Sequence, residues 1–296
     1  MKNKIKASLC VIICMLITFC LCACNAGFKV NSGGTESVTD GQTLSVHYLD
    51  VGQGDSIFIE LPQNKTMLID AATAEYGDGI AEYIYEQGYE KIDYLIVTHP
   101  HADHIGGMKA VVEKFEIDKI YMPKASTTTK TYKNLLQAIK DKGLKINTAK
   151  AGITIAQSDN LKIDILAPNS DSYDELNNYS AVIKITYGDR AFLFMGDAEK
   201  LSEQEIKADV KADVLKAGHH GSSSSTSEEF LARVNPTAAV ISCGKDNSYG
   251  HPHKETLEAL EKAGIEIYRT DTMGTIIAST DGESLEITDN NTAVNH

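Results

Sequence analysis

The sequence predicts an alternating α/β fold built as one large domain. Short apolar runs rich in β-branched residues, typical of buried strands, alternate with segments whose apolar residues have helical spacing. Glycine and small polar residues separate most of these segments, as expected for turns. The chain has 296 residues, 42% of them hydrophobic, which is enough for a single domain of about 250 residues.

The N-terminus has the pattern of a signal peptide. It opens with a basic segment that contains Lys2, Lys4 and Lys6. Residues 7–23 are uncharged and mostly apolar, and this run is shorter than the roughly 20 residues of a transmembrane helix. Residues 21–24, Leu-Cys-Ala-Cys, resemble a lipobox, which implies cleavage before Cys24 and lipidation of its thiol. An uncleaved membrane anchor is the alternative, and both interpretations predict a membrane-tethered domain outside the cytoplasm.

The chain is predicted to have four parts. Residues 1–23 form the signal peptide, and residues 24–42, rich in Gly, Ser, Thr and Asn, form a flexible tether. Residues 43–289 form the folded domain, and residues 290–296 form a polar tail that we expect to be disordered. Five of the six Cys lie within the first 24 residues, so no disulfide is possible within the domain. Its Cys243 is expected to be a small buried hydrophobe.

The first half of the domain begins with strands and then alternates. Strands are predicted at residues 44–49, 56–61, 65–70, 93–98, 119–122, 145–148, 153–156 and 161–167. Helices are predicted at residues 76–88, 105–115 and 130–142. The first and third of these helices end near Gly88 and Gly143, and glycine favours the left-handed conformation that ends many helices.

The second half continues the same alternation. Strands at residues 181–187 and 190–195 form a hairpin around a Gly-Asp turn. Further strands are predicted at residues 213–218, 237–242, 265–269, 273–279 and 284–288. Helices are predicted at residues 201–208, 226–234 and 255–263, with Thr226 or Ser227 as the cap of the second.

The densest chemical motif follows the strand at residues 93–98. It reads Thr-His-Pro-His-Ala-Asp-His-Ile-Gly-Gly and holds four candidate metal ligands, His99, His101, Asp103 and His104. Imidazole and carboxylate are the ligands that Zn²⁺, Mn²⁺ or Fe²⁺ binds. His99 and His101 share one side of an extended segment, and Asp103 and His104 can face a second point. The spacing therefore predicts two adjacent metals.

Later strand ends carry further candidate ligands. Asp197 follows Gly196 at the end of a buried strand, and His219-His220 follows another, so one of these two His is expected to be the last ligand. His251 opens the last helix and could contact the substrate. No His lies between His104 and Asp197.

The net charge of the chain is acidic. It is −13 over the whole chain and −16 without residues 1–23, which contain three Lys and no acidic residue. Proteins whose main work is gripping phosphate backbones are usually basic. The composition therefore argues against tight binding of long DNA, although bound cations would add local positive charge.

Several motifs together identify a resemblance to a known family. H-x-H-x-D-H followed by Gly-Gly resembles the signature of the metallo-β-lactamase-fold hydrolases. The spelling of residues 98–107, together with residues 50–56, 177–180 and 247–252, resembles the hydrolase domain of the ComEC/Rec2 competence proteins. This resemblance implies a four-layer αβ/βα sandwich, two divalent metal ions (Zn or Mn), and Asp197 as the ligand that bridges them.

The resemblance also assigns supporting roles. Asp70 would orient the metal loop without binding metal. Asp55 lies in a turn that would approach the active site, or it is purely structural. Most members of the family have a further His between the metal loop and the bridging Asp, and this chain lacks it, so the site nearer His99 is expected to be the weaker of the two. Asn177 and Ser180 would bind substrate or simply order their loop, and Asn177 is one polar residue that could complete this His-poor site. Asp103 and His251 are the candidate catalytic residues.

The implied function is metal-dependent hydrolysis, most consistent with a phosphodiesterase or nuclease that acts on DNA. Two alternatives stay open: hydrolysis of a cell-envelope phosphoester, and metal-dependent capture of a ligand without catalysis. The expected partners are the substrate, the membrane through the lipid anchor and a competence channel. The lack of the usual third His argues against a β-lactamase proper.

Overall fold

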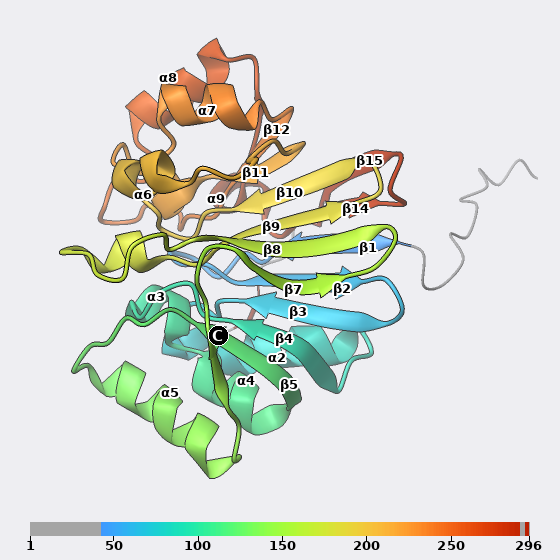
Figure 1. Cartoon of the computed structure of the whole chain (residues 1–296), viewed down its shortest axis with the longest axis vertical. Helices are drawn as coiled ribbons and strands as arrows, with labels where there is room; N and C mark the ends of the chain where they lie inside the picture. Colours follow the sequence, from blue (N-terminus) through green and yellow to red (C-terminus); the bar gives the residue numbers. More distant parts are fainter. Residues whose placement is uncertain (1–42, 291–293, 296) are drawn as a thin grey trace, which may run out of the picture. The chain divides into compact units, whose positions relative to one another are not determined.

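Two mixed β-sheets form the centre of the fold in the computed structural model, which describes residues 43–290, 294 and 295 (Figure 1). The first sheet has the order β15-β14-β1-β2-β3-β4-β5-β6. Its strands are β1 (Leu44–Tyr48), β2 (Ile57–Leu61), β3 (Lys65–Ile69), β4 (Lys91–Ile96), β5 (Glu116–Met122), β6 (Ile146–Thr148), β14 (Ile276–Thr280) and β15 (Leu285–Asp289). The strands from β3 to β6 run parallel, and their neighbours on the other side are antiparallel.

The second sheet has the order β13-β12-β11-β10-β9-β8-β7. Its strands are β7 (Ile153–Gln157), β8 (Leu161–Ala167), β9 (Val182–Tyr187), β10 (Arg190–Phe194), β11 (Val214–Lys216), β12 (Ala238–Ile241) and β13 (Glu266–Arg269). The strands from β10 to β13 are parallel, and those from β7 to β10 are antiparallel. Each sheet thus has a parallel part whose strands end at one edge, and side chains gather at that edge.

Strand alternation explains why the sheets are buried on both faces. In β3, Met67 and Ile69 join the core between the sheets, whereas Leu68 between them joins a second core on the outer face. Phe192 and Phe194 of β10 likewise face the central core, and Leu193 faces a third. Successive side chains of a strand point to opposite faces, so each strand supplies apolar residues to two cores.

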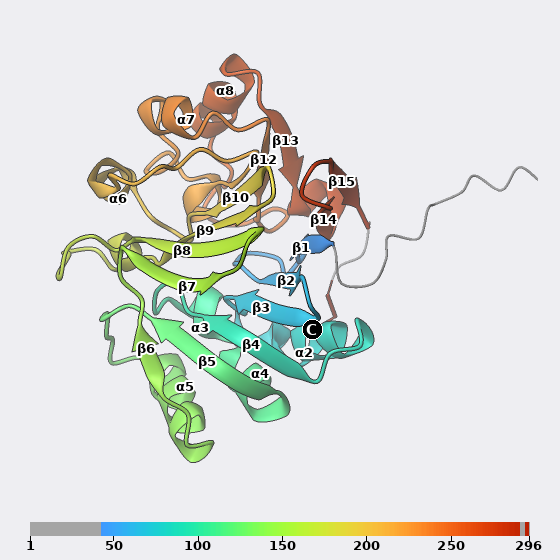
Figure 2. The ribbon, with the colours of Figure 1, turned by 45° about the vertical axis from the view of Figure 1, so that its right-hand side comes forward.

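Helices cover the outer face of each sheet (Figure 2). On the first sheet lie η1 (Ala74–Tyr76), α2 (Gly77–Glu86), α3 (Ala102–Ile105), α4 (Met108–Lys114) and α5 (Lys130–Asp141). On the second lie α6 (Lys200–Glu205), α7 (Glu228–Val234) and α8 (Lys254–Lys262). The short elements η2 (Leu176–Tyr179), η3 (Gly218–Gly221) and α9 (Thr270–Met273) lie in connections between strands, and Met273 of α9 packs against the central core. The layers are therefore helix, sheet, sheet and helix, which confirms the predicted four-layer sandwich.

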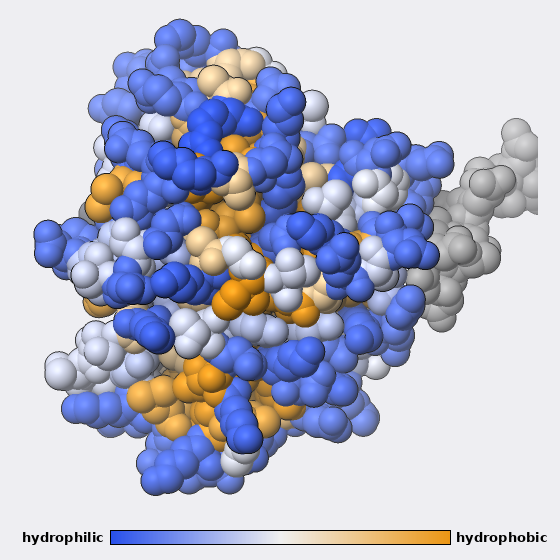
Figure 3. All heavy atoms as spheres, in the orientation of Figure 1, coloured by the Kyte–Doolittle hydropathy of each residue, from blue (hydrophilic) through white to orange (hydrophobic). Residues whose placement is uncertain are grey.

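The outer helices are amphipathic. In α5 only Leu135, Ala138 and Ile139 are buried, and the rest of the helix faces outward or is partly covered. The face of the molecule in Figure 3 is accordingly mostly hydrophilic, with smaller apolar areas. Among the residues the structure describes, no helix is both long and apolar enough to cross a membrane.

The observed elements match the predicted ones with a few differences. The helix predicted at residues 105–115 is split: α3 begins at Ala102, and α4 follows after Gly106-Gly107. The short helix α9 was not predicted. Ser227, one of the two predicted caps, accepts a hydrogen bond from the Phe230 amide at the start of α7. Cys243 is fully buried in the outer core of the second sheet, as predicted.

The structure describes none of the predicted N-terminal segments and part of the predicted C-terminal tail. The predicted signal peptide, the lipidation site Cys24 and the tether lie outside the described residues. In the polar tail the structure describes Val294, which is 5% exposed and whose amide donates to the carbonyl of Asp50. This residue of the tail is therefore packed against the domain.

Candidate metal centre

The candidate ligands meet where parallel strands of both sheets end. The loop after β4 carries His99 and His101, and the first turn of α3 carries Asp103 and His104. From the second sheet, the turn after β10 carries Asp197, and η3, which follows β11, carries His219 and His220. Because β10 and β11 are parallel neighbours, their C-terminal ends lie side by side. Tertiary structure thus joins residues that are about 120 positions apart in the sequence.

A first cluster contains His99, His101 and Asp197. Their ligand atoms all lie within 4.8 Å of one another. His99 Nε2 is 2.9 Å from His101 Nδ1 and 3.6 Å from Asp197 Oδ2. These three groups could hold one metal ion from one side.

A second cluster contains Asp103, His104 and His220. His220 Nε2 is 3.4 Å from Asp103 Oδ2. The other oxygen of Asp197, Oδ1, is 3.2 Å from His104 Nε2 and 3.6 Å from His220 Nε2. Asp197 therefore presents one oxygen to each cluster, which is the geometry expected of a bridging carboxylate.

Three buried atoms at the second cluster make no hydrogen bond. They are His104 Nε2, His220 Nε2 and Asp197 Oδ1. Buried polar atoms in proteins nearly always have a partner, and two imidazole nitrogens that face one carboxylate oxygen are a ligand set that a divalent cation satisfies. The donor set therefore fits a bound metal.

Charges in the cluster perturb the ionisation of its members. Burial opposes protonation of His220, but the carboxylates of Asp197 and Asp55 outweigh it and raise its pKa to about 9. Burial likewise opposes ionisation of Asp197, but His104 and His220 hold its pKa well below the usual range. A metal ion needs neutral imidazole, so its binding must release the proton of His220 and should weaken as the pH falls.

In His104 and His220, the ring nitrogen Nδ1 points away from the second cluster and contacts an oxygen atom. His104 Nδ1 is 2.7 Å from Asp70 Oδ2, and His220 Nδ1 is 3.0 Å from the carbonyl oxygen of Ser242. Asp70 also accepts hydrogen bonds from the amide and the hydroxyl of Thr98, next to the metal loop. Such contacts fix the ring orientation and leave the other nitrogen free to bind metal. Asp70 thus lies between His104 and Thr98, behind the candidate ligands.

A buried ion pair lies below His220. Asp55 Oδ2 is 2.8 Å from Lys216 Nζ, and Asp55 Oδ1 is 3.2 Å from His220 Nδ1. Burial raises the pKa of Asp55, but Lys216 and His220 outweigh this and lower it to about 2. Sequence reasoning placed Asp55 near the site but missed Lys216. The available signal was a Lys in the otherwise apolar strand Val-Leu-Lys-Ala at residues 214–217.

His219 lies beside the two clusters and belongs to neither. Its Nε2 is 3.7 Å from Asp197 Oδ2, and its Nδ1 is 3.1 Å from the hydroxyl of Ser224. Both His219 and His220 have left-handed backbone conformations, with φ of 49° and 53°. Such conformations are costly for residues other than glycine, so this turn keeps strained residues at the site.

Asn177 and Ser180 both support site residues from behind. The Asn177 side-chain amide is 3.3 Å from Glu199 Oε1 and 3.4 Å from His219 Nδ1, the nitrogen that faces away from Asp197. The Ser180 hydroxyl accepts from the Asp197 amide at 3.1 Å and is 3.4 Å from His99 Nδ1. In this arrangement Ser180 holds two residues of the first cluster, whereas Asn177 holds His219 beside the clusters.

A pocket of about 350 Å³ opens over the clusters. Its lining includes Asp103, His219 and His220 at the base and Gln53, Tyr249 and His251 at the mouth. Burial and the neighbouring His220 lower the pKa of His251 to about 4. At neutral pH this imidazole is therefore uncharged and can donate or accept a hydrogen bond.

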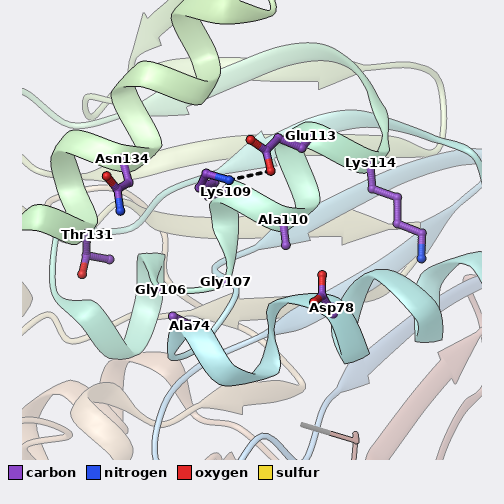
Figure 4. A pocket seen from close by; sticks show the side chains of 10 residues that line it. All are labelled: Ala74, Asp78, Gly106, Gly107, Lys109, Ala110, Glu113, Lys114, Thr131 and Asn134. Carbon is purple, nitrogen blue, oxygen red and sulfur yellow. Dashed lines mark hydrogen bonds and ion pairs between the residues drawn. The ribbon is translucent and has the colours of Figure 1, made fainter.

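A larger pocket, of about 570 Å³, lies behind the metal loop (Figure 4). It is bounded by Gly106-Gly107 and by side chains of α4 and α5. Its charged residues are Asp78, Lys109, Glu113 and Lys114, and Lys109 pairs with Glu113 at 2.7 Å. Positive and negative groups balance here, and none of the candidate ligands lines it, so the smaller pocket is the candidate active site.

Comparisons with known proteins agree with this geometry. A family model described as the metallo-beta-lactamase superfamily matches residues 49–245. ComE operon protein 3 of Bacillus subtilis is 34% identical over 251 residues, which cover 78% of this chain and 32% of that protein. Recombination protein 2 of Haemophilus influenzae is 30% identical over 251 residues, which cover 83% of this chain and 30% of that protein. The chain thus spans about a third of the length of these curated relatives.

A solved structure shows the same fold at low sequence identity. The diiron β-hydroxylase CmlA from Streptomyces venezuelae matches with a TM-score of 0.53 and 14% identity, over 76% of this chain and 52% of that one. The residues matched by the family model run from the end of β1 to beyond β12, and so include both candidate metal clusters. By its sequence and by its site, the chain belongs to the metallo-beta-lactamase superfamily.

Proposed function

We propose that this protein is a metal-dependent phosphodiesterase that hydrolyses DNA outside the cytoplasm. The family and the site support a metal-dependent hydrolase. The observation that carries the proposal further is the pair of clusters that share Asp197, with one carboxylate oxygen directed to each. Two adjacent cations are a recurring arrangement for the in-line displacement of phosphate esters.

Different residues would bind the metals, orient the attacking water and contact the leaving oxygen. Bound divalent ions would polarise the phosphoryl oxygen and make water a better nucleophile near neutral pH. His99, His101, Asp103, His104, Asp197 and His220 would hold them. Asp103 is 28% exposed at its side chain, which lets its carboxylate orient a water molecule in the pocket. His251 is uncharged at neutral pH, so it would donate a hydrogen bond to the leaving oxygen.

The proposal of DNA as substrate rests on relatives and motifs. The sequence motifs resemble those of competence proteins, and one curated relative is named Recombination protein 2. Competence and recombination both handle DNA, which makes a phosphodiester the first bond to test. A net charge of −13 is unfavourable for a long duplex, so we expect short or single-stranded segments to be cleaved best.

The proposal also includes a location. The basic start, the apolar run and the Leu-Cys-Ala-Cys segment support lipidation of Cys24 and tethering at the outer surface of the membrane. A domain in this place would meet DNA before uptake, where a competence channel is a possible partner. Labelling with a radioactive or clickable fatty acid, compared between the natural chain and Cys24→Ala, tests the anchor.

The first test is DNA cleavage by the full chain, purified in detergent with Mn²⁺ or Zn²⁺. Single- and double-stranded DNA are followed over time with the natural chain, Asp103→Asn and Asp118→Asn. Asp118 is an exposed carboxylate on β5, so its variant controls for the loss of one charge. We expect Asp103→Asn to lower the rate by about 100-fold or more, because even residues behind a metal ligand cost about 10- to 100-fold.

Two results would count against this function. An absence of metal-dependent cleavage by the natural chain would reject the nuclease and direct the search to envelope phosphoesters. Binding of DNA without turnover, unaffected by Asp103→Asn, would instead support capture without catalysis.

A further inference from the structure

An exposed aromatic ring stands at the mouth of the metal pocket. Tyr249 is 65% exposed and is one of the lining residues of that pocket. Most large apolar side chains in the described part of the chain are buried, and of the few exposed ones Tyr249 lies beside candidate metal ligands. It stacks on His251, with ring centroids 5.6 Å apart and an angle of 20° between the planes.

Hydrogen bonds of the Asn247 side chain hold the loop that carries Tyr249. Asn247 Oδ1 accepts hydrogen bonds from the amides of Tyr249 and His251, at 3.2 and 3.0 Å. The Asn247 side-chain amide donates to the carbonyl oxygens of Gly244 and His251. Asn247 thus holds the backbone of this turn, and the Tyr249 ring rests against His251. A ring held in this way loses little conformational entropy when a flat ligand binds.

Three rings lead from the metal cluster to the surface. His220 belongs to the second cluster, His251 is 6.2 Å from it, and Tyr249 is 5.6 Å from His251, all measured between ring centroids. The planes of Tyr249 and His251 are close to parallel, at 20°, and those of His251 and His220 are tilted by 31°. A phosphate held at the metal end would therefore have a stacking surface beside the groups attached to it.

We propose that Tyr249 is a stacking platform for the nucleobase next to the phosphate that is cleaved. The substrate class is single-stranded nucleic acid, because the bases of a duplex are already stacked and unavailable unless flipped out. The chain is acidic, with a net charge of −13, and stacking is a source of affinity that does not depend on positive charge. This inference rests on the proposed function for the presence of a phosphate at the metals.

The test measures binding separately from cleavage. The full chain with Asp103→Asn is the parent, since the first cluster, which does not include Asp103, can still hold a metal. Fluorescence anisotropy in Mn²⁺ at fixed salt follows a labelled single-stranded 12-mer of mixed sequence. Its partner probe is an oligonucleotide of the same length in which abasic sites replace the bases.

Tyr249→Ala is expected to weaken binding of the base-bearing strand by about 5- to 150-fold, the range for loss of one stacked base. Tyr249→Trp should restore it, and both variants should bind the abasic strand as the parent does. Tyr85→Ala is the matched control, because Tyr85 is 56% exposed and lies on α2, away from the pocket. It should leave both affinities unchanged.

The outcomes separate this inference from the proposed function. The platform would be overturned if Tyr249→Ala weakened the affinity for both strands equally, or left both affinities unchanged. It would also be overturned if the parent bound neither strand. If the natural chain fails to cleave DNA while Tyr249→Ala still lowers only the affinity for the base-bearing strand, the stacking platform is supported and the phosphodiesterase activity is rejected. Circular dichroism of each variant confirms that it is folded.

Discussion

At the scale of single residues, the buried pair of Asp55 and Lys216 is the most consequential feature beyond the ligands. Both side chains are at most 2% exposed, and Asp55 also faces His220. Taking a charge out of water costs several kcal/mol unless it is paired. Lys216 Nζ donates to Asp55 and to the carbonyl oxygen of Ala217, so the pair fixes the strand end that leads to His219 and His220.

We predict that Lys216→Met lowers the free energy of unfolding by about 3 to 5 kcal/mol, because it leaves a buried carboxylate without its cation. Urea unfolding followed by circular dichroism measures this. The double variant Asp55→Asn with Lys216→Met removes both charges and should recover part of the loss. A Lys216→Met chain within about 1 kcal/mol of the natural one would show that the pair is not a buried charge pair in solution.

At the scale of elements, the turn between β1 and β2 supports the metal loop by direct backbone contact. The amide of Asp55 donates to the carbonyl oxygen of Asp103 at 3.1 Å, and Ala72 donates to the carbonyl of Asp55. Gly54 lies at the closest approach, where an added Cβ would be 2.5 Å from the carbonyl oxygen of Asp103. The turn and the short helix α3 therefore fit together only while residue 54 has no side chain.

We predict that Gly54→Ala lowers both stability, by about 1 to 3 kcal/mol, and metal affinity, because the Cβ pushes the loop at Asp103 away. Isothermal titration with Zn²⁺ and urea unfolding give the two quantities. Gly88→Ala is the matched control, since Gly88 also has a positive φ, of 91°, but nothing lies within 4 Å of its added Cβ. It should cost only the strain of its backbone, about 1 kcal/mol, and leave metal affinity unchanged. Equal metal affinity in both variants would contradict the contact argument.

Element prediction from the sequence failed at the places where tertiary contacts override local preference. Ala102 to Ile105 form the short helix α3, although the sequence places residues 102–104 in the loop before a helix that begins at Ile105. The turn of α3 is closed by backbone bonds to the carbonyl of His101, and the His104 carbonyl accepts from Ala71 of a neighbouring segment. Similarly, His219 and His220 adopt left-handed conformations, which are uncommon for residues other than glycine. Strained residues of this kind are concentrated at functional sites.

At the scale of the whole molecule, the candidate metal centre joins the two sheets. His99, His101, Asp103 and His104 follow a strand of the first sheet, whereas Asp197 and His220 follow strands of the second. A metal ion bound by both groups crosslinks the two halves of the sandwich. Anything that binds the folded state alone stabilises it by mass action.

We predict that Zn²⁺ at about 100 times its dissociation constant raises the free energy of unfolding by about 2.7 kcal/mol, and that a chelator reverses this. The gain should shrink as the pH falls, because protons compete at His220, whose pKa without metal is about 9. Urea unfolding at two pH values, with and without Zn²⁺, measures both effects. Asp197→Asn removes the shared ligand, so a full metal-dependent gain in that variant would contradict the crosslink.

The sequence by itself determined the α/β class, most element positions and the candidate ligand side chains. Strand alternation, helical spacing and the H-x-H-x-D-H motif are patterns among residues close in the sequence, so they are visible without the tertiary structure. Only the tertiary structure decided which of His219 and His220 faces the second cluster, that each oxygen of Asp197 serves a different cluster, and that Lys216 reaches Asp55. Those facts depend on which strand ends become neighbours in the sheets, and that is set by packing between segments far apart in the chain.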